Sequence, residues 1–253
     1  MVVPKEPTAI DQLNEAVEFA LDHSRIMGSI SAPDTESAPL IERVREFVYA
    51  LDAGEVPDKY PLKTHYIMDR IDPIQFHLSF TLKGILNSYG MWAIVDKEWT
   101  KVLADHIGKR HALEIMAGSG WLTKALRGHG VSMSSTDDQS WKHVHQLAKG
   151  DGTVEAITNL DALEAVHAFP HAEILIVSWP PYNETFIVDV CDAWGSDRPI
   201  IFIGEGSGGC TACNEFFTHY DGQRLDVDMP RHQGIHDYVY CGYWRRTKDV
   251  QKE

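Results

Sequence analysis

A strand, a glycine-rich turn and the start of a helix are predicted between Leu113 and Leu122. The residues there are Leu-Glu-Ile-Met-Ala-Gly-Ser-Gly-Trp-Leu. Glycines let the backbone turn sharply and approach a ligand closely, and the first amide groups of a helix are free to donate and carry a partial positive charge. This arrangement can hold a nucleoside cofactor, and it is typical of α/β proteins with a parallel sheet.

The turn lacks the third glycine of a dinucleotide-binding fingerprint, which has the pattern Gly-x-Gly-x-x-Gly. After Gly118 and Gly120, the third position holds Thr123. The turn therefore favours a nucleoside cofactor without a pyrophosphate group, and an NAD-type oxidoreductase is a less favoured alternative.

From His111 onward, short apolar runs alternate with helix-length segments, a pattern typical of a parallel sheet with crossover helices. Five such strands are expected at residues 112–116, 131–135, 154–158, 173–178 and 199–204. Two further strand-like runs, 224–229 and 238–244, are too close in sequence for a crossover helix between them, so they are expected to pair antiparallel.

The first 108 residues have apolar side chains at helical spacing instead. Helices are expected around residues 10–21 and 40–51, from 72 to near 90, and over 96–107. The prediction is a helical cap at 1–108, followed by a Rossmann-like core at 109–253. Its α/β sheet should be doubly wound, mostly parallel and seven-stranded, with an antiparallel last strand.

The Gly-Ser-Gly segment resembles motif I of the class I S-adenosylmethionine-dependent methyltransferases, whose loop wraps the amino-acid part of the cofactor. The resemblance implies S-adenosylmethionine as cofactor, with the acidic residue of the motif beside its amino-acid part. Met116 stands where that family usually has its first glycine. The cofactor-binding residues implied in this turn are Glu114, Ala117, Gly118, Ser119 and Gly120.

Acidic residues also follow the second and third predicted strands, and the carboxyl ends of parallel strands meet at one edge of a sheet. Asp137, or else Asp138, lies about 20 residues beyond the turn, where a carboxylate can accept hydrogen bonds from ribose hydroxyls. Asp161, next to Ala162, resembles the family residue that accepts from the adenine amino group. Each acid could instead be a helix N-cap or a solvated charge.

The fourth predicted strand ends in Ser-Trp-Pro-Pro-Tyr, which resembles the Asp/Asn/Ser-Pro-Pro-aromatic motif of amino-group methyltransferases. There, the polar residue and the first proline's carbonyl accept from the amine, and the ring stacks on a planar substrate. Here the acceptor position holds Trp179, whose indole can only donate. Alternatively, the prolines only end the strand and the aromatic rings pack at the lip of the crevice. The candidate catalytic residues are Ser178, Trp179, Pro180, Pro181 and Tyr182, and Ser178 is also a candidate cofactor contact.

Four glycines lie within the six residues 204–209, which permits unusual dihedral angles or the close approach of a ligand. Glu205 is expected to face the crevice as a general base or as a ligand for a substrate amine, with its pKa raised if it is buried. The alternative is a flexible loop with a solvated carboxylate. Cys210 and Cys213 have no second Cys-x-x-Cys pair as partner, so no metal site is assigned.

The formal net charge of −14 disfavours a nucleic-acid partner, because an acidic surface repels a phosphate backbone. No apolar run approaches the length that spans a bilayer, so no membrane association is expected. Four cysteines and the lack of a visible export signal favour a cytoplasmic location. The oligomeric state stays open.

These observations predict methyl transfer from S-adenosylmethionine to a small or medium-sized nucleophile, with a planar amine as the candidate acceptor. One alternative is a protein of the same fold that binds S-adenosylmethionine or a nucleoside without catalysis. Another is a nucleic-acid amino-methyltransferase, which the Pro-Pro-Tyr segment favours and the net charge disfavours.

Overall fold

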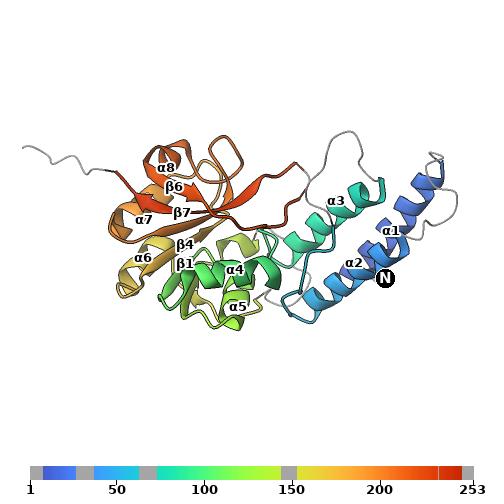
Figure 1. The fold of residues 1–253 in the computed structure, drawn as a ribbon, viewed down its shortest axis with the longest axis horizontal. Coiled ribbons are helices and arrows are strands. Elements are labelled where there is room, and N and C mark those ends of the chain that lie inside the picture. Colours follow the sequence, from blue (N-terminus) through green and yellow to red (C-terminus); the bar gives the residue numbers. More distant parts are fainter. Residues whose placement is uncertain (1–7, 27–36, 63–72, 144–152, 233, 247–253) are drawn as a thin grey trace, which may run out of the picture.

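The computed structural model describes residues 8–26, 37–62, 73–143, 153–232 and 234–246 (Figure 1). Within these residues, four helices precede the first strand, as predicted: α1 (Ala9–Ile26), α2 (Ser37–Asp52), α3 (Pro73–Ser88) and α4 (Lys97–Ile107). Helix α4 begins where the Asp96 carboxylate accepts a hydrogen bond from the Trp99 amide at 3.1 Å. No helix of the described part is both long and apolar enough to cross a membrane.

The strands form one seven-stranded sheet in the order β3-β2-β1-β4-β5-β7-β6. Strands β1 to β5 pair parallel, and β7 pairs antiparallel with both of its neighbours, so the predicted fold class is confirmed. The strands are β1 (Ala112–Ile115), β2 (Met133–Asp137), β3 (Thr158–Asn159), β4 (Ile174–Ser178), β5 (Ile200–Glu205), β6 (Tyr220–Arg224) and β7 (Asp237–Trp244). The helices between them are α5 (Trp121–Gly128), α6 (Ala162–Ala168), α7 (Phe186–Trp194) and α8 (Asn214–His219).

The direction of the chain across the sheet reverses between β1 and β4. From β1, successive strands are added outward through β2 to β3, whereas β4 lies on the other side of β1 and is followed outward by β5. Ligands of doubly wound sheets bind beyond the carboxyl ends of the strands at such a reversal. The glycine turn after β1 and the Pro-Pro-Tyr segment after β4 therefore adjoin the expected binding crevice.

The two faces of the sheet bury different side chains, because successive residues of a strand point to opposite faces. Ile174, Ile176, Ile201 and Ile203 belong to a cluster with buried residues of α4 and α5. Leu175, Val177, Ile200 and Phe202 belong to a second cluster with residues of α6, α7 and α8. The sheet is thus the middle layer of three.

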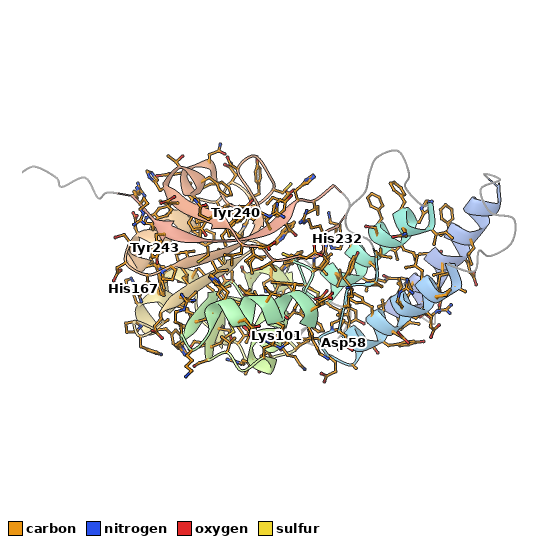
Figure 2. All side chains as sticks on the ribbon, viewed as in Figure 1. Asp58, Lys101, His167, His232, Tyr240 and Tyr243 are labelled. Carbon is orange, nitrogen blue, oxygen red and sulfur yellow. The ribbon has the colours of Figure 1, made fainter. Side chains whose placement is uncertain are left out.

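The first of these clusters continues into the N-terminal helices without interruption. It joins buried residues of α1, α2 and α3 to the sheet, and it includes Val227 and Met229 from the segment before β7. Figure 2 shows His232 of the same segment where the helical part meets the sheet. The His232 ring is buried and meets the Tyr60 ring edge-on, with the ring centroids 6.3 Å apart. Burial lowers the pKa of His232 to about 4.

Two strands lie elsewhere than predicted. The sixth was expected at residues 224–229 but spans Tyr220–Arg224, because the alternating apolar residues beyond it are buried in the first cluster rather than paired in the sheet. The third was expected at 154–158 but is only Thr158–Asn159. The Val154 amide instead donates to the Ser119 carbonyl at 2.9 Å, so the segment before β3 packs against the glycine turn.

Candidate functional site

A cavity of about 680 Å³ lies beyond the carboxyl ends of β1, β2 and β4, and its volume is in the range of small-molecule sites. Most of its wall comes from residues that directly follow strands. These are Met116 and Gly118 after β1, Asp137 and Asp138 at the end of β2, Leu160, Asp161, Ala162 and Leu163 after β3, and Trp179, Pro180, Pro181 and Tyr182 after β4. The remaining wall is formed by Trp92, Ser140, Trp141, Phe186, Asp189, Val190 and Cys210.

The glycine turn has a backbone that most other residues would strain. Gly118 and Gly120 have φ angles of 57° and 88°, in the left-handed region, and Gly120 is the N-cap of α5. Met116 also has a positive φ, 53°, which is uncommon for a residue with a side chain. The position that holds glycine in motif I thus keeps a conformation that favours glycine, although the residue is methionine.

Asp137 fastens the glycine turn to the end of β2. Its carboxylate accepts hydrogen bonds from the Gly118 amide at 2.7 Å, the Gln139 amide at 2.5 Å and the Trp141 indole at 3.1 Å. Burial raises the pKa of Asp137, although these three hydrogen bonds oppose the shift. The same side chain lines the cavity, so its predicted contact with a ribose would add to its role in shaping the turn.

Asp138 and Asp161 are exposed and line the same cavity. The Asp138 carboxylate accepts from the Ser140 amide at 2.9 Å. Asp161 is the N-cap of α6, where its Oδ1 accepts from the Leu163 and Glu164 amides, both at 2.8 Å. The helix-cap alternative therefore describes Asp161 correctly, and the carboxylate still borders the cavity beside the buried Ala162.

Glu114 lies behind the main cavity rather than in its wall. It is fully buried and accepts a short hydrogen bond from the Thr123 hydroxyl, and burial raises its pKa to about 7. With Ala117 and Ser178, it borders a much smaller cavity of about 30 Å³. Met116 also lines both cavities, so the two adjoin.

Two residues of the predicted cofactor turn, Ser119 and Gly120, are absent from the described walls of both cavities. Ser119 is fully buried, and its hydroxyl has no hydrogen-bond partner within the described part of the chain. Gly120 packs closely, because a Cβ there would come within 3.0 Å of both the Glu155 and Ile157 side chains. These two positions therefore serve the packing of the turn in this structure.

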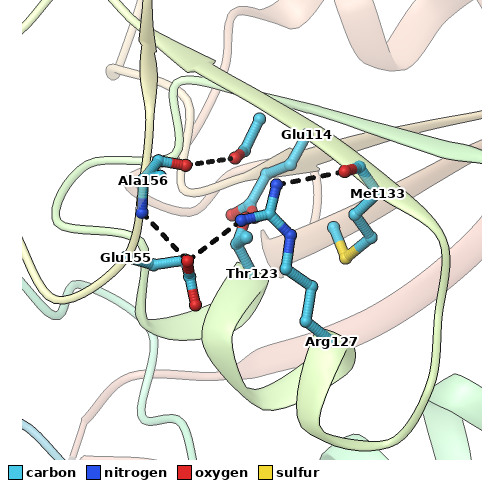
Figure 3. A network of polar contacts seen from close by, with 7 residues as sticks. Glu114, Thr123, Arg127, Met133, Glu155 and Ala156 are labelled. Carbon is cyan, nitrogen blue, oxygen red and sulfur yellow. Dashed lines mark hydrogen bonds and ion pairs between the residues drawn. The ribbon is translucent and has the colours of Figure 1, made fainter.

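A polar network around Arg127 supports the helix that follows the turn (Figure 3). The guanidinium contacts the Glu155 carboxylate at 3.1 Å and donates to the Met133 carbonyl at 3.1 Å. Glu155 also accepts from the Ala156 amide at 3.0 Å. Helix α5 is thereby joined both to β2 and to the segment that packs on the turn.

Trp179 lines the cavity, but its indole N–H is hydrogen-bonded within the protein. It donates to Oδ2 of Asp237 at 2.9 Å, and the Trp179 backbone has a φ of 50°. Asp237 is fully buried, which raises its pKa to about 7, and the hydrogen bond from Trp179 opposes the shift. At the position where amino-group methyltransferases have an acceptor, this chain therefore has a donor that is bound to its own β7.

The Pro-Pro-Tyr segment is bonded to the loop after β5. The Pro180 carbonyl accepts from the Ala212 amide at 3.1 Å, and the Asn183 amide donates to the Ala212 carbonyl at 2.9 Å. A carbonyl oxygen has two lone pairs, so Pro180 retains one for a ligand. Tyr182 is 68% exposed although it lines the cavity, and Pro181 is exposed beside it.

The expectation for Glu205 was wrong in two respects. Glu205 is not among the described residues that line the cavity, because its carboxylate accepts from the Cys210 amide at 2.8 Å and the His236 amide at 2.9 Å. Burial raises its pKa, but these hydrogen bonds outweigh burial and the pKa is lowered overall. A Cβ at Gly209 would lie 2.3 Å from the Glu205 Cβ, so the glycine-rich loop makes its close approach to this side chain.

Several residues of the cavity were outside the predicted site, among them three aromatic residues and one aspartate. The Trp92 and Trp141 rings meet edge-on with centroids 6.2 Å apart. Phe186 and Asp189 lie one turn apart at the start of α7. They follow the Pro-Pro-Tyr segment at helical spacing, which is the signal that could have indicated them. The described lining has four aspartates and no lysine, arginine or histidine.

In the described residues, no group of three or more histidine, cysteine, aspartate or glutamate side chains is arranged to hold a metal ion. The four cysteines are free thiols. Cys210 is exposed and borders the cavity, and its hydrogen bond with Glu205 raises its pKa.

No protein-family model matches the sequence, and comparison with curated protein sequences gives no match. Solved structures with partial likeness include a SAM-dependent methyltransferase from Agrobacterium tumefaciens, with 11% identity over 60% of this chain and 61% of that one, at a TM-score of 0.34. A point mutant of MtNAS has 12% identity over 93% of this chain and 98% of that one, at a TM-score of 0.40. Human N-acetylserotonin methyltransferase in complex with SAM has 11% identity over 81% of this chain and 67% of that one, at a TM-score of 0.38. Likeness of this degree establishes neither a family nor an activity for this chain.

Proposed function

We propose that this chain binds S-adenosylmethionine and transfers its methyl group to a small or medium-sized nucleophile. The observation that carries the proposal is the charge of the cavity, whose described wall has the carboxylates of Asp137, Asp138 and Asp161 at the ends of β2 and β3 and no basic side chain. S-adenosylmethionine has a sulfonium and an ammonium group, which carboxylates attract. The pyrophosphate of NAD would be repelled by the same wall, so the dinucleotide alternative is disfavoured.

The motif resemblance and the lining of the cavity support a proposed role for each residue toward the cofactor. Asp137 or Asp138 would accept from the ribose hydroxyls, and Asp161 from the adenine amino group, with Ala162 beside it. Gly118 lies in the cavity wall, and a Cβ there would be in ordinary van der Waals contact with the Gly90 carbonyl oxygen at 3.5 Å. When bound, S-adenosylmethionine supplies a methyl group on a positively charged sulfur.

The chain's own contribution is to hold the acceptor in line and to limit water. Alignment of two reactants accounts for a large part of the rate in such transfers. Trp179, Tyr182 and Phe186 supply apolar walls, and the second lone pair of the Pro180 carbonyl can accept a hydrogen bond from an acceptor N–H or O–H. The charge of the cavity and of the whole chain disfavours a nucleic-acid acceptor.

Isothermal titration with S-adenosylmethionine, S-adenosylhomocysteine and NAD tests the cofactor. We expect the first two to bind and NAD not to bind. Asp161→Asn keeps an oxygen that can cap α6 but removes the charge from the cavity, and it should weaken S-adenosylmethionine binding. Glu164→Gln, an exposed neighbour outside the described cavity wall, is the matched control. Failure of both S-adenosyl compounds to bind would refute the proposal.

A protein that binds the cofactor without catalysis is the second candidate. It is favoured by the contacts of Trp179 and Pro180, which use the indole N–H and one carbonyl lone pair within the protein. Formation of S-adenosylhomocysteine in the presence of amine, hydroxyl and nucleic-acid acceptors separates the two candidates. Binding with no turnover across that panel would favour the second.

A further inference from the structure

We propose that Asp189, Tyr182 and Phe186 form an acceptor subsite for an alkylamine that carries a positive charge in water and is attached to an aromatic ring. The inference rests on the proposed function of the same cavity and specifies the class of acceptor. None of these three side chains is needed for the cofactor contacts assigned above.

Asp189 differs from the other three carboxylates of the cavity. Asp137, Asp138 and Asp161 each accept hydrogen bonds from backbone amides two residues further along the chain. Asp189 is exposed to solvent, and its carboxylate has no hydrogen bond or ion pair to any described residue. Its charge is therefore uncompensated within the described protein, and it faces a cavity whose described wall offers no cation.

Two exposed aromatic rings line the same cavity, one just before α7 and one at the start of that helix. Tyr182 is 68% exposed and Phe186 is 37% exposed, and both line the cavity. Large apolar side chains that remain in contact with water at a cavity commonly mark a binding site. The face of an aromatic ring attracts a cation, and a planar ring of a ligand can stack on it.

The placement of these residues follows from helix geometry. Phe186, Asp189 and Val190 are three and four residues apart in α7, so they share one side of the helix. Tyr182 lies in the turn just before this helix. One wall thus combines two rings with a free carboxylate, which is the combination that binds a protonated amine attached to a planar group.

The carboxylate also suits the chemistry of an amine acceptor. A protonated amine has no lone pair, and an Asp189 oxygen can accept the proton while the bonding electrons stay on nitrogen. The nitrogen is then nucleophilic in the cavity where the methyl donor is proposed to bind. Neutral alcohols and carboxylic acids gain neither of these interactions from Asp189.

Three probes with the same ring and different charges test the subsite by binding rather than by activity. Benzylammonium, benzyl alcohol and phenylacetate are titrated at pH 7.5 with tryptophan fluorescence, with and without S-adenosylhomocysteine. We expect benzylammonium to bind about fivefold more tightly than benzyl alcohol, and phenylacetate to bind most weakly. Asp189→Asn should remove the preference for benzylammonium and leave the affinity for S-adenosylhomocysteine unchanged.

Glu184→Gln is the matched control, because it removes one negative charge five residues away from an exposed position outside the described cavity wall. It should keep the preference of the wild-type chain. Equal affinity of the wild-type chain for benzylammonium and benzyl alcohol would overturn the subsite, as would an equal loss of preference in both variants. Absence of S-adenosylhomocysteine binding would refute the proposed function instead, so the two failures are distinguishable.

Discussion

Replacing Glu114 by glutamine tests whether this buried carboxyl group makes folding stability depend on pH. Burial in β1 raises its pKa from the ordinary value of 4.5 to about 7, and the hydrogen bond from Thr123 opposes this shift. The folded chain therefore binds the proton more tightly than the unfolded chain. The resulting stability is fully present below pH 4.5 and is lost as the pH rises through 7.

The two pKa values give the magnitude. Between pH 6 and pH 8.5, the folded chain releases almost one proton from Glu114, whereas the unfolded chain has already lost it. The free energy of unfolding should fall by about 1.4 kcal/mol over this interval through this one group. A glutamine keeps an oxygen that accepts from the Thr123 hydroxyl and stays neutral at every pH in the interval.

Urea denaturation followed by far-ultraviolet circular dichroism at pH 6, 7.5 and 8.5 measures the effect. From pH 6 to pH 8.5, we expect the free energy of unfolding of Glu114→Gln to rise by about 1.4 kcal/mol relative to that of the wild-type chain. The contribution of Asp237, whose pKa is also raised to about 7, is common to both chains and cancels. Glu164→Gln, at an exposed position in α6, should follow the wild-type curve. Parallel curves for Glu114→Gln and wild type would refute the reasoning.

Three further substitutions probe other contacts, each measured by urea denaturation. Asp137→Asn should lower the free energy of unfolding by about 2 kcal/mol, because the asparagine NH2 group then faces backbone amides that donate to the carboxylate in the wild-type chain. A loss no larger than that of Asp138→Asn, at an exposed position, would contradict this. Trp179→Phe at pH 8 should cost about 1–3 kcal/mol by leaving Asp237 without its donor. Gly84→Ala in α3, where a Cβ meets open space, should stabilise by about 0.5–1 kcal/mol, and destabilisation would argue against that helix.

The general position of the cavity could be predicted because it depends on periodicity. Short apolar runs separated by helix-length segments indicate a parallel sheet, and a parallel sheet brings the residues after its strands to one edge. Asp137, Asp161 and Trp179 were located by this rule, and all three line one cavity. What each side chain contacts could not be predicted, since those contacts depend on distances between separate loops.

The displaced sixth strand shows where periodicity fails. Leu225, Val227 and Met229 alternate with polar residues as in a strand, but they pack in or against the cluster that contains the N-terminal helices. The actual strand, Tyr220–Arg224, directly follows α8 and is mostly exposed or half-buried, so its sequence lacks apolar alternation. Alternation reports that one side of an extended segment is buried, and it does not identify what buries it.

Glu205 shows a second limit of sequence reasoning. A glycine-rich stretch after a strand indicates a close approach, but the approaching group can be a ligand or the protein itself. Here the chain folds back so that the Cys210 and His236 amides donate to the carboxylate at the end of β5. Asp189 illustrates the converse, since no motif includes it and only the packing of α7 brings it to the cavity.

The uninterrupted apolar cluster between the N-terminal helices and the sheet restricts how this protein can move. A rigid-body swing of α1 to α3 would pull apart close-packed side chains and expose them to water, at about 25 cal/mol for each Å² of apolar surface. Tyr182 and Phe186, by contrast, line the cavity and are both exposed in part to solvent. Ligand entry is therefore expected to depend on rotation of these rings, with the helices acting as a fixed scaffold rather than a hinged cover.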